Sequence, residues 1–434
     1  MIMRIWLLAS LLVQFSCMAN TQSVGIASAI TTSNQTIIRY DSIHHPVVAR
    51  HGMVVTQNEL ASRVGQNILE QGGNAIDATV AIGFALAVTL PRAGNLGGSG
   101  FMLIHMEQAQ ETVALDFRSI APSAARLEDF IDEDGSILWD DLTFGVRAPA
   151  VPGTVAGLYH AWQKFGSLPW PLLLAPAINL AKEGIAVSED LAYALAEAMP
   201  IMSQYPSSIV AYARDADNSY LAGEILHQPD LAWSLERISE QGANALYSGD
   251  IAEKIIDFMD RSGGYISSQD LQNYQVKERE PIATNYRQHK VVTMPPSSVG
   301  GLALLQMLNV LKQFDVSRLE PGSARSLHLL AEVMKRVNAN RRQGIGDTDF
   351  VSVPIKGILS EELAKEIAAS IDLEVALPVS VIKPIDANPY DSRETTHYSV
   401  VDDFGNAVST SYTLGYSFGS GPVSYTHLTL PTKA

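Results

Sequence analysis

Cysteine is almost absent from this sequence, because Cys17 is the only one among 434 residues. Cys17 lies in a stretch that we expect to be removed, as explained below, so the mature chain would carry no thiol. Such a chain has no disulfide, no thiolate nucleophile and no metal site built on cysteine. The ten histidines are scattered, and neither an H-E-x-x-H motif nor a cluster of histidine and aspartate is present. The sequence therefore predicts no metal centre and no cofactor.

Basic residues are scarce relative to acidic ones, with 30 lysines and arginines against 46 aspartates and glutamates. The formal charge of −16 and the pI near 5 leave no basic stripe that could neutralise phosphates, so we expect no nucleic-acid partner. Repeats and long low-complexity linkers are missing too. With 47% hydrophobic residues, the chain can bury a sizeable core in two or three domains or in one large α/β domain.

Long hydrophobic runs are missing except for a short one near the start. Arg4 precedes the apolar stretch 5–15, and small residues up to Ala19 follow it. A charged start, a short apolar core and a small-residue exit are typical of a secretory signal peptide, and this core is too short to span a bilayer. We therefore expect cleavage after Ala19, a periplasmic or secreted protein and no integral membrane span. Lipid attachment at Cys17 is the alternative.

Helical and extended patterns alternate along the rest of the chain. Asn58 fits the N-cap of an amphipathic helix that ends at Gly72 and Gly73. The next stretch, 75–90, is apolar nearly all round and predicts a buried helix. Further expected elements are paired strands at 101–107 and 112–118, a largely helical middle at 153–275, a strand at 289–296, and helices at 299–313 and 323–343. Hairpins mixed with helices indicate α+β layers rather than a purely parallel sheet.

The stretch "DSRETTHYSVVD" at 391–402 and the alternating residues after it predict a hairpin with a loop at 403–405. A three-residue loop makes the numbers of paired residues sum to 808, so that Thr395 faces Thr413. A four-residue loop makes the sum 809 and moves the partner of Thr395 by one residue. Either way, two hydroxyls meet at the open end of the hairpin, and Thr413 could orient Thr395 through a hydrogen bond. Taken alone, such a pair favours a structural interpretation, and His397 is interpreted as a strand residue rather than a base.

Arg118 ends an apolar strand and precedes a turn that contains proline. An arginine in that place is most often a solvated or paired surface residue. Its functional interpretation is a bidentate clamp on a substrate carboxylate. The glycine-rich stretches at 94–100 and 295–301 fit tight turns, with Ser297 or Ser298 capping the helix that follows.

Eight stretches, taken together and in this order, resemble the γ-glutamyltranspeptidase family, the glutathione hydrolases. They are "GMVVTQNELAS", "GGNAIDATVA", "GNLGGSGFMLIH", "LDFRSIAP", "VPGTVAGL", "PPSSVGGLALLQMLNVL", "KRVNANRRQGIGDTDFVSVP" and "ETTHYSVVDDFGNAVSTSYTL". They run from about residue 49 to residue 421, so the resemblance covers nearly the whole mature chain.

The resemblance implies an α+β fold of the N-terminal-nucleophile hydrolase type, a four-layer αββα sandwich that is incomplete here at its C-terminus. It implies that a precursor cuts itself between Glu394 and Thr395, which separates a large subunit at 20–394 from a small catalytic subunit that starts with 395–421. The new α-amine of Thr395 would activate its own hydroxyl for attack on the γ-carbonyl of a γ-glutamyl donor such as glutathione. Water would release glutamate, and an amino acid or dipeptide would accept the γ-glutamyl group instead.

By the same resemblance, Arg118 holds the glutamyl α-carboxylate and Thr413 orients the nucleophile. The sequence departs from the family at Gly415, where well-known members carry an asparagine that helps to bind the substrate α-amine. This departure leaves room for an acylase of the same fold that cleaves a glutaryl side chain from a β-lactam. A second alternative is an unprocessed, non-catalytic secreted relative that binds amino-acid-like ligands.

Residues 422–434, "PVSYTHLTLPTKA", resemble instead the in-frame translation of a sequencing-library adapter. We therefore expect the family resemblance to end near Gly421 and residues 422–434 to pack poorly. We also expect the chain as it stands to be an inactive fragment, because the hairpin after Thr395 would leave sheet edges unpaired. The alternative is a genuine short C-terminus.

Overall fold

The computed structural model describes residues 46–344, 346–382 and 394–423. The chain divides into two compact units, Met1–Arg50 and His51–Ala434. The described residues of the first unit, 46–50, are exposed and belong to no helix or strand. The predicted signal peptide at 1–19 lies outside the described residues. All candidate site residues belong to the second unit, whose fold is described below.

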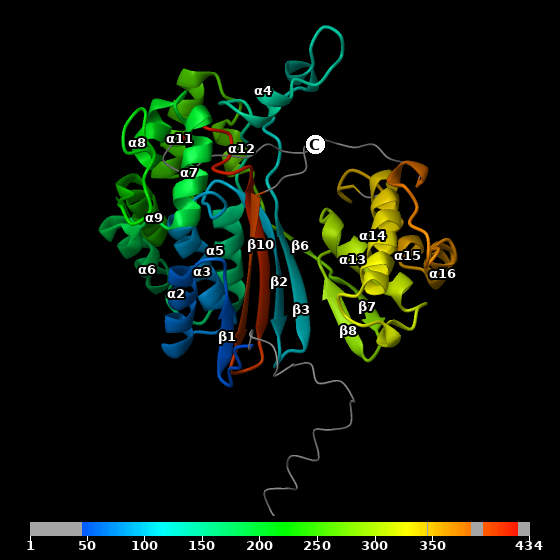
Figure 1. Ribbon diagram of the computed structural model, residues 1–434. Helices are drawn as coiled ribbons and strands as arrows, with labels where there is room; N and C mark the ends of the chain where they lie inside the picture. Colours follow the sequence, from blue (N-terminus) through cyan, green and yellow to red (C-terminus); the bar gives the residue numbers. More distant parts are fainter. Residues whose placement is uncertain (1–45, 345, 383–393, 424–434) are drawn as a thin grey trace, which may run out of the picture. The chain divides into compact units, whose positions relative to one another are not determined.

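The centre of the second unit is an antiparallel sheet of six strands (Figure 1). In spatial order these strands are β1 (Gly52–Val55), β9 (Glu394–Asp402), β10 (Ala407–Gly415), β2 (Ser99–Met106), β3 (Glu111–Phe117) and β6 (Lys277–Arg279). The predicted pairing of β2 with β3 and the predicted hairpin of β9 and β10 are both confirmed. The hairpin therefore lies between β1 and β2, which come from the other end of the described chain. The expectation that the hairpin leaves sheet edges unpaired is wrong, because both of its strands have a partner on their outer side.

Helices lie mainly on one face of this sheet, and those from α5 to α12 fill the predicted helical middle of the chain (Figure 1). They are α2 (Glu59–Glu70), α3 (Ala75–Thr89), α4 (Trp139–Thr143), α5 (Thr154–Phe165), α6 (Trp170–Glu183), α7 (Glu189–Met202), α8 (Pro206–Tyr212), α9 (Pro229–Gln241), α10 (Asn244–Tyr247), α11 (Asp250–Ser262) and α12 (Ser268–Gln272). Helix α3 packs against β9 and β10, and α5 packs against β2 and β3. Two short strands, β4 (Ile185–Ala186) and β5 (Ile225–Leu226), pair among these helices.

Helix α3 confirms the prediction of a buried helix, since all of its residues are buried. It lies between the sheet on one side and α2, α5 and α6 on the others, which is why it is apolar all round. Its polar exception, Asp77, has a structural role. The Asp77 carboxylate accepts hydrogen bonds from the main-chain N–H groups of Asn74, Ser167 and Leu168, at 3.0–3.2 Å. Burial of this charge is therefore compensated by fixed donors.

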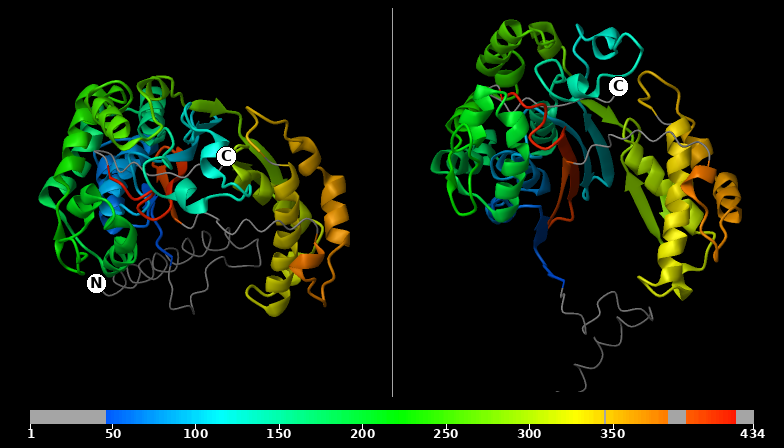
Figure 2. Two further views of the ribbon diagram at one scale, coloured as in Figure 1. Left: turned by 90° about the horizontal axis from the view of Figure 1, so that it is seen from above. Right: turned by 45° about the horizontal axis from the view of Figure 1, so that its top comes forward.

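A second, smaller hydrophobic cluster involves the elements that follow the sheet strand β6 (Figure 2). Its elements are β7 (Ile282–Tyr286), β8 (His289–Thr293), α13 (Val299–Leu311), α14 (Ala324–Gly344), α15 (Ile355–Ile358) and α16 (Glu361–Ala369). β7 and β8 form a hairpin, and α13 contacts that hairpin, α14 and α16. The cluster joins Val310 of α13 to Val333 of α14 and Ile367 of α16. The predicted strand and both predicted helices of this region are confirmed.

The ends of the helices follow the predicted turn chemistry with one exception. Asn58 caps α2, since its side chain accepts hydrogen bonds from the N–H groups of Leu60 and Ala61. Gly72, at a φ of +88°, adopts the left-handed conformation that ends this helix. Ser298 occupies the N-cap position of α13, but its hydroxyl makes no capping hydrogen bond. The predicted position of the serine cap is therefore confirmed at Ser298, but the capping hydrogen bond is absent. The hydroxyl of the preceding serine, Ser297, has another partner, given below.

The chain beyond Gly421 departs from the expectation of poor packing where the structure describes it. Pro422 is buried, and Val423 packs partly against the main hydrophobic core. The buried Ser208 fixes this segment, because its hydroxyl donates to the Gly421 carbonyl at 2.5 Å and accepts from the Val423 N–H at 3.1 Å. The expectation of poor packing is thus wrong for Pro422 and Val423, and residues 424–434 lie outside the described residues. Within the described ranges, no helix is long and apolar enough to cross a membrane.

Candidate active site

Thr395 lies at the open end of the hairpin, one residue after the start of β9. Paired residues of β9 and β10 have numbers that sum to 808 from Ala407–Val401 to Tyr412–Thr396, so of the two alternatives the register is that of the three-residue loop. Continuing this register by one residue places Thr395 beside Thr413, and the Thr395 hydroxyl donates a long hydrogen bond of 3.4 Å to the Thr413 hydroxyl. The Thr395 side chain is exposed, on the face of the sheet opposite α3.

A β-bulge follows Thr413 and shapes this end of the strand. The pairing shifts by one between Tyr412 and Gly415, and Gly415 adopts a φ of +87°. The bulge turns the Gly415 N–H back, so that it donates to the Thr413 hydroxyl oxygen at 2.8 Å. The Thr413 hydroxyl is thereby held in place and its own proton can point elsewhere. Gly415 therefore helps to fix the hydroxyl that contacts Thr395.

Arg118 belongs to the same end of the sheet as Thr395. Thr413 pairs with Ser99 of β2, and Phe117, the last residue of β3, pairs with Gly100. Continuing this register by one residue places Arg118 beside Ser99. Thr395 and Arg118 thus stand three strands apart in one row, which corresponds to about 14 Å between their main chains.

The Arg118 side chain is half-buried and is available for a ligand. Its guanidinium carbon lies 6.0 Å from the centre of the Phe101 ring. Among the residues that the structure describes, no carboxylate forms an ion pair with Arg118, although most of the described arginines have such a partner. Of the two ordinary interpretations of an arginine at a strand end, a solvated or an ion-paired residue, the described residues therefore provide no partner for the second.

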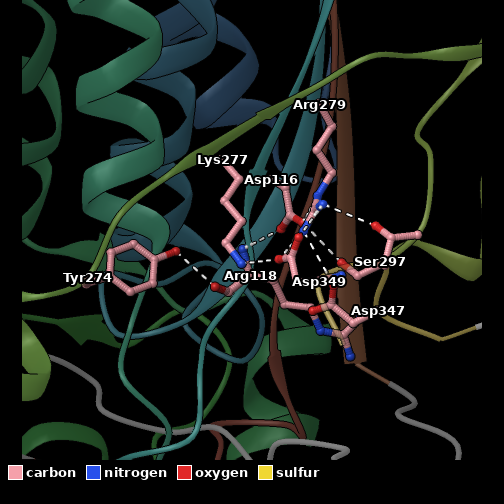
Figure 3. A network of polar contacts seen from close by, with 9 residues as sticks. Asp116, Arg118, Tyr274, Lys277, Arg279, Ser297, Asp347 and Asp349 are labelled. Atoms are coloured by element: carbon pink, nitrogen blue, oxygen red, sulfur yellow. Dashed lines mark hydrogen bonds and ion pairs between the residues drawn. The ribbon is translucent and has the colours of Figure 1, made fainter. Parts of the chain in front are cut away.

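Asp116 is a site residue that the sequence analysis missed. Its buried carboxylate accepts a hydrogen bond from the Arg118 N–H at 3.0 Å, from the Ser297 hydroxyl at 3.1 Å and from Arg279 Nε at 2.6 Å (Figure 3). Arg279 in turn binds the Asp349 carboxylate with two nitrogens, at 3.1 and 2.9 Å. The only signal in the sequence was an aspartate inside an apolar strand, where a charge requires a partner.

His397 lies two residues from Thr395 on the same face of β9. One ring nitrogen is 2.8 Å from the Ser411 hydroxyl, and the other is 3.1 Å from the Ser399 hydroxyl. Burial lowers the pKa of His397 below its usual value of 6.5, so the ring is neutral at neutral pH. Both ring nitrogens are thus engaged by strand hydroxyls, as the interpretation of His397 as a strand residue predicts.

Residues 415–419 spell G-x-S-x-G, a string typical of serine hydrolases. A nucleophile elbow requires a strand before the serine and a helix directly after it. Here β10 precedes Ser417, but residues 416–421 form turns, and no described helix follows them. This string therefore does not provide a competing nucleophile. No group of three or more metal-ligating side chains gathers anywhere in the described part of the chain.

Comparison with known proteins agrees with this geometry. The family model described as Gamma-glutamyltranspeptidase matches residues 61–427. The chain belongs to the γ-glutamyltranspeptidase family. The match continues past Gly421, where we expected the resemblance to end. The chain is 42% identical over 385 residues to the glutathione hydrolase proenzyme of Escherichia coli (strain K12), which is 88% of this chain and 66% of that protein. This chain thus spans about two thirds of the length of that relative.

Solved structures of the γ-glutamyltranspeptidase family and of an acylase resemble the chain. The γ-glutamyltranspeptidase of Helicobacter pylori is 40% identical, with a TM-score of 0.76, and the similarity covers 80% of this chain and 100% of that one. A cephalosporin acylase from Bacillus halodurans is 28% identical, also with a TM-score of 0.76, over 89% of this chain and 71% of that one. These similarities confirm the predicted α+β fold of the N-terminal-nucleophile hydrolases.

Proposed function

We propose that this chain belongs to a γ-glutamyl hydrolase and transferase that uses Thr395 as its nucleophile. The observation that carries the proposal is the hydroxyl pair of Thr395 and Thr413, 3.4 Å apart at the open end of a hairpin, in a member of the γ-glutamyltranspeptidase family. The signal peptide predicted at 1–19 supports a place in the periplasm or outside the cell. The precursor would yield a large subunit ending at Glu394 and a small one beginning at Thr395.

The precursor first cuts itself. The Thr395 hydroxyl attacks the carbonyl carbon of Glu394, the peptide C–N bond breaks, and the nitrogen leaves as the α-amine of Thr395. Water hydrolyses the resulting ester, which frees the hydroxyl again. Thr395 now carries a base and a nucleophile on one residue, so that neither a histidine nor an aspartate is required.

In each later turnover, the α-amine takes the proton of the Thr395 hydroxyl as the oxygen attacks the γ-carbonyl carbon of the donor. The amide C–N bond breaks, the departing amine receives the proton, and a γ-glutamyl ester on Thr395 remains. Thr413 orients the attacking oxygen through the hydrogen bond described above, since its own oxygen is fixed by the Gly415 N–H. Water then gives hydrolysis, and an amino-acid or dipeptide amine gives transfer.

Arg118 binds the donor at the opposite end. A γ-glutamyl group has three carbons between its α-carboxylate and its γ-carbonyl. That length and an extended arginine side chain together suit the separation of about 14 Å between the main chains of Arg118 and Thr395. A guanidinium without a protein carboxylate can bind the substrate carboxylate through two parallel hydrogen bonds.

A second candidate is an acylase that removes a glutaryl group, and two observations favour it. Gly415 has no side chain with which to bind a substrate α-amine, and the chain resembles a cephalosporin acylase over most of its length. A glutaryl group keeps the carboxylate that Arg118 would bind and lacks the amine.

Hydrolysis of two anilides by the protein expressed from its complete gene separates the two candidates. The proposal predicts that γ-glutamyl-4-nitroanilide is turned over with a higher kcat/KM than glutaryl-4-nitroanilide. A preference for the glutaryl compound would favour the acylase. Turnover of neither compound, with the chain uncut on a denaturing gel, would support the non-catalytic alternative and contradict the proposal.

A further inference from the structure

The main chain of Arg118 is held from both sides by side chains. Its N–H donates to Asp116 Oδ1 at 3.0 Å, and its carbonyl accepts a hydrogen bond from the Tyr274 hydroxyl at 2.9 Å (Figure 3). Strand β3 ends at Phe117, so no ladder hydrogen bond with a neighbouring strand fixes Arg118. The two side chains take over that task for the one residue that would bind the substrate carboxylate.

Asp116 is itself rigidly held. It is 4% exposed, and its second oxygen accepts hydrogen bonds from Arg279 Nε at 2.6 Å and from the Ser297 hydroxyl at 3.1 Å. Arg279 is anchored at its far end by Asp349, which also pairs with Lys277 of the same strand. A carboxylate fixed by several donors presents a defined acceptor position to the Arg118 N–H.

Tyr274 is equally well fixed on the other side. Its ring stacks on Tyr247, with centroids 5.5 Å apart and an angle of 14° between the planes. Gly153 packs so closely that a Cβ on it would lie 2.1 Å from the Tyr274 hydroxyl. Burial raises the pKa of Tyr274 well above its usual value of 10, so the hydroxyl stays protonated and donates to the Arg118 carbonyl.

We propose that Tyr274 and Asp116 are positioning residues that set the direction of the Arg118 side chain, and thereby the affinity of the site for the donor carboxylate. The inference rests on the proposed function. Rotation of the peptide planes on either side of Arg118 would swing a long side chain away from the row that contains Thr395. Loss of either hydrogen bond would weaken substrate binding and leave the chemical step nearly unchanged, because neither Tyr274 nor Asp116 touches the reacting atoms.

A matched pair of variants tests the role of Tyr274. Tyr274→Phe removes only the hydroxyl that reaches Arg118. Tyr247→Phe removes the other hydroxyl of the same stack, which donates to the Pro152 carbonyl at 2.8 Å and has no contact with Arg118. With γ-glutamyl-4-nitroanilide, Tyr274→Phe is expected to raise KM about five- to tenfold with kcat nearly unchanged. Tyr247→Phe is expected to change KM by less than about twofold, even if it destabilises the fold as much as Tyr274→Phe does.

The substrate provides the second readout. 4-Aminobutyryl-4-nitroanilide lacks the α-carboxylate, so its KM is expected to be the same for Tyr274→Phe and the unmodified protein. Asp116→Asn keeps an oxygen for the Arg118 N–H and is expected to raise KM less than Asp116→Ala does. Equal effects of the two tyrosine variants, or equal effects on both anilides, would overturn the inference and leave the proposed function intact. An unmodified protein that turns over neither γ-glutamyl nor glutaryl anilide would instead contradict the proposed function, and the inference with it.

Discussion

Arg118 illustrates how much a single side chain decides at the residue scale. It has no carboxylate partner among the described residues, and it stands in one row with Thr395. Arg118→Ala should raise the KM for a γ-glutamyl anilide by about 100-fold, because the substrate carboxylate loses a charge-assisted partner. Arg118→Lys should recover only part of this loss, since an ammonium cannot form the two parallel hydrogen bonds.

Self-cleavage separates this effect from misfolding. In the proposed mechanism Arg118 takes no part in the attack of Thr395 on Glu394, so both variants should still be cut into two fragments, as a denaturing gel would show. An unchanged KM in Arg118→Ala would return Arg118 to the role of an ordinary surface residue.

Gly415 is the second residue with a clear prediction. Gly415→Asn should lower the free energy of unfolding by about 1 kcal/mol, because the φ of +87° disfavours any side chain, although asparagine tolerates it best. It should also raise the ratio of kcat/KM for γ-glutamyl over glutaryl anilide by about tenfold, since the amide supplies an acceptor for the α-amine. Gly415→Ala imposes the same strain without the amide. If both variants change the ratio equally, the amide has no part in recognition.

At the scale of elements, the hairpin and α3 are joined by one carboxylate. Asp402, at the end of β9, accepts hydrogen bonds from the N–H groups of Phe404 and Asn406 in the turn. Its other oxygen accepts from the Ala75 N–H at 2.9 Å, at the positive end of the α3 dipole. The same side chain thus closes the hairpin and caps the buried helix beneath it.

Removal of the Asp402 carboxylate should lower the stability of the whole fold. Asp402→Ala leaves buried donors without partners and is expected to lower the free energy of unfolding by about 2–3 kcal/mol. Asp403→Ala is the control, because the neighbouring carboxylate is 61% exposed and should matter by less than about 0.5 kcal/mol. Urea denaturation of the two variants compares them directly, and equal midpoints would refute the joint role of Asp402.

At the scale of the whole molecule, the sequence predicted features that depend on residues close together in the chain, and it missed contacts between residues that are far apart in the chain. Helix α3, the β2–β3 pair and the register of the β9–β10 hairpin depend on periodicity and turn residues that lie close together in the sequence. The partners of Asp116 do not: Arg279 is 163 residues away, and Ser297 is 181 residues away. No local pattern marks such pairs, so the carboxylate that holds Arg118 could not be predicted.

Thr395, the proposed nucleophile, shows a second limit of sequence analysis. The register alone brought Thr395 opposite Thr413, yet it could not distinguish a catalytic pair from an ordinary pair of strand residues. Only the resemblance to a family gave the pair its chemical meaning. Ser297 shows the limit set by distance in the sequence, because its hydroxyl binds the distant carboxylate of Asp116 and does not cap α13.

The ion pair of Arg279 and Asp349 joins strand β6 of the sheet to the segment after α14. Its loss at low pH should therefore affect the stability of the whole molecule. Hydrogen bonds from Arg279 and then Lys277 lower the pKa of Asp349 from 3.8 to about 2. A carboxyl whose pKa is lower in the folded state contributes stability above its unfolded pKa and loses it as the pH falls through the folded pKa. This contribution should therefore be complete above pH 4 and vanish towards pH 2.

Melting temperatures measured from pH 5 to pH 2 test this dependence. The unmodified protein should lose more stability between pH 4 and pH 2 than Asp349→Asn, which has no carboxyl to titrate there. Parallel curves for the two proteins would show that the pairing of Asp349 does not contribute to acid sensitivity.

The most direct test of the central claim is N-terminal sequencing of the smaller fragment from the protein expressed from its complete gene. If Thr395 is both the agent of cleavage and the nucleophile, this fragment begins Thr-Thr-His-Tyr. Thr395→Ala then remains one uncut chain without activity, whereas Thr395→Ser keeps part of both functions because it retains the hydroxyl and the amine. A fragment that begins at another residue, or efficient cleavage of Thr395→Ala, would contradict the account.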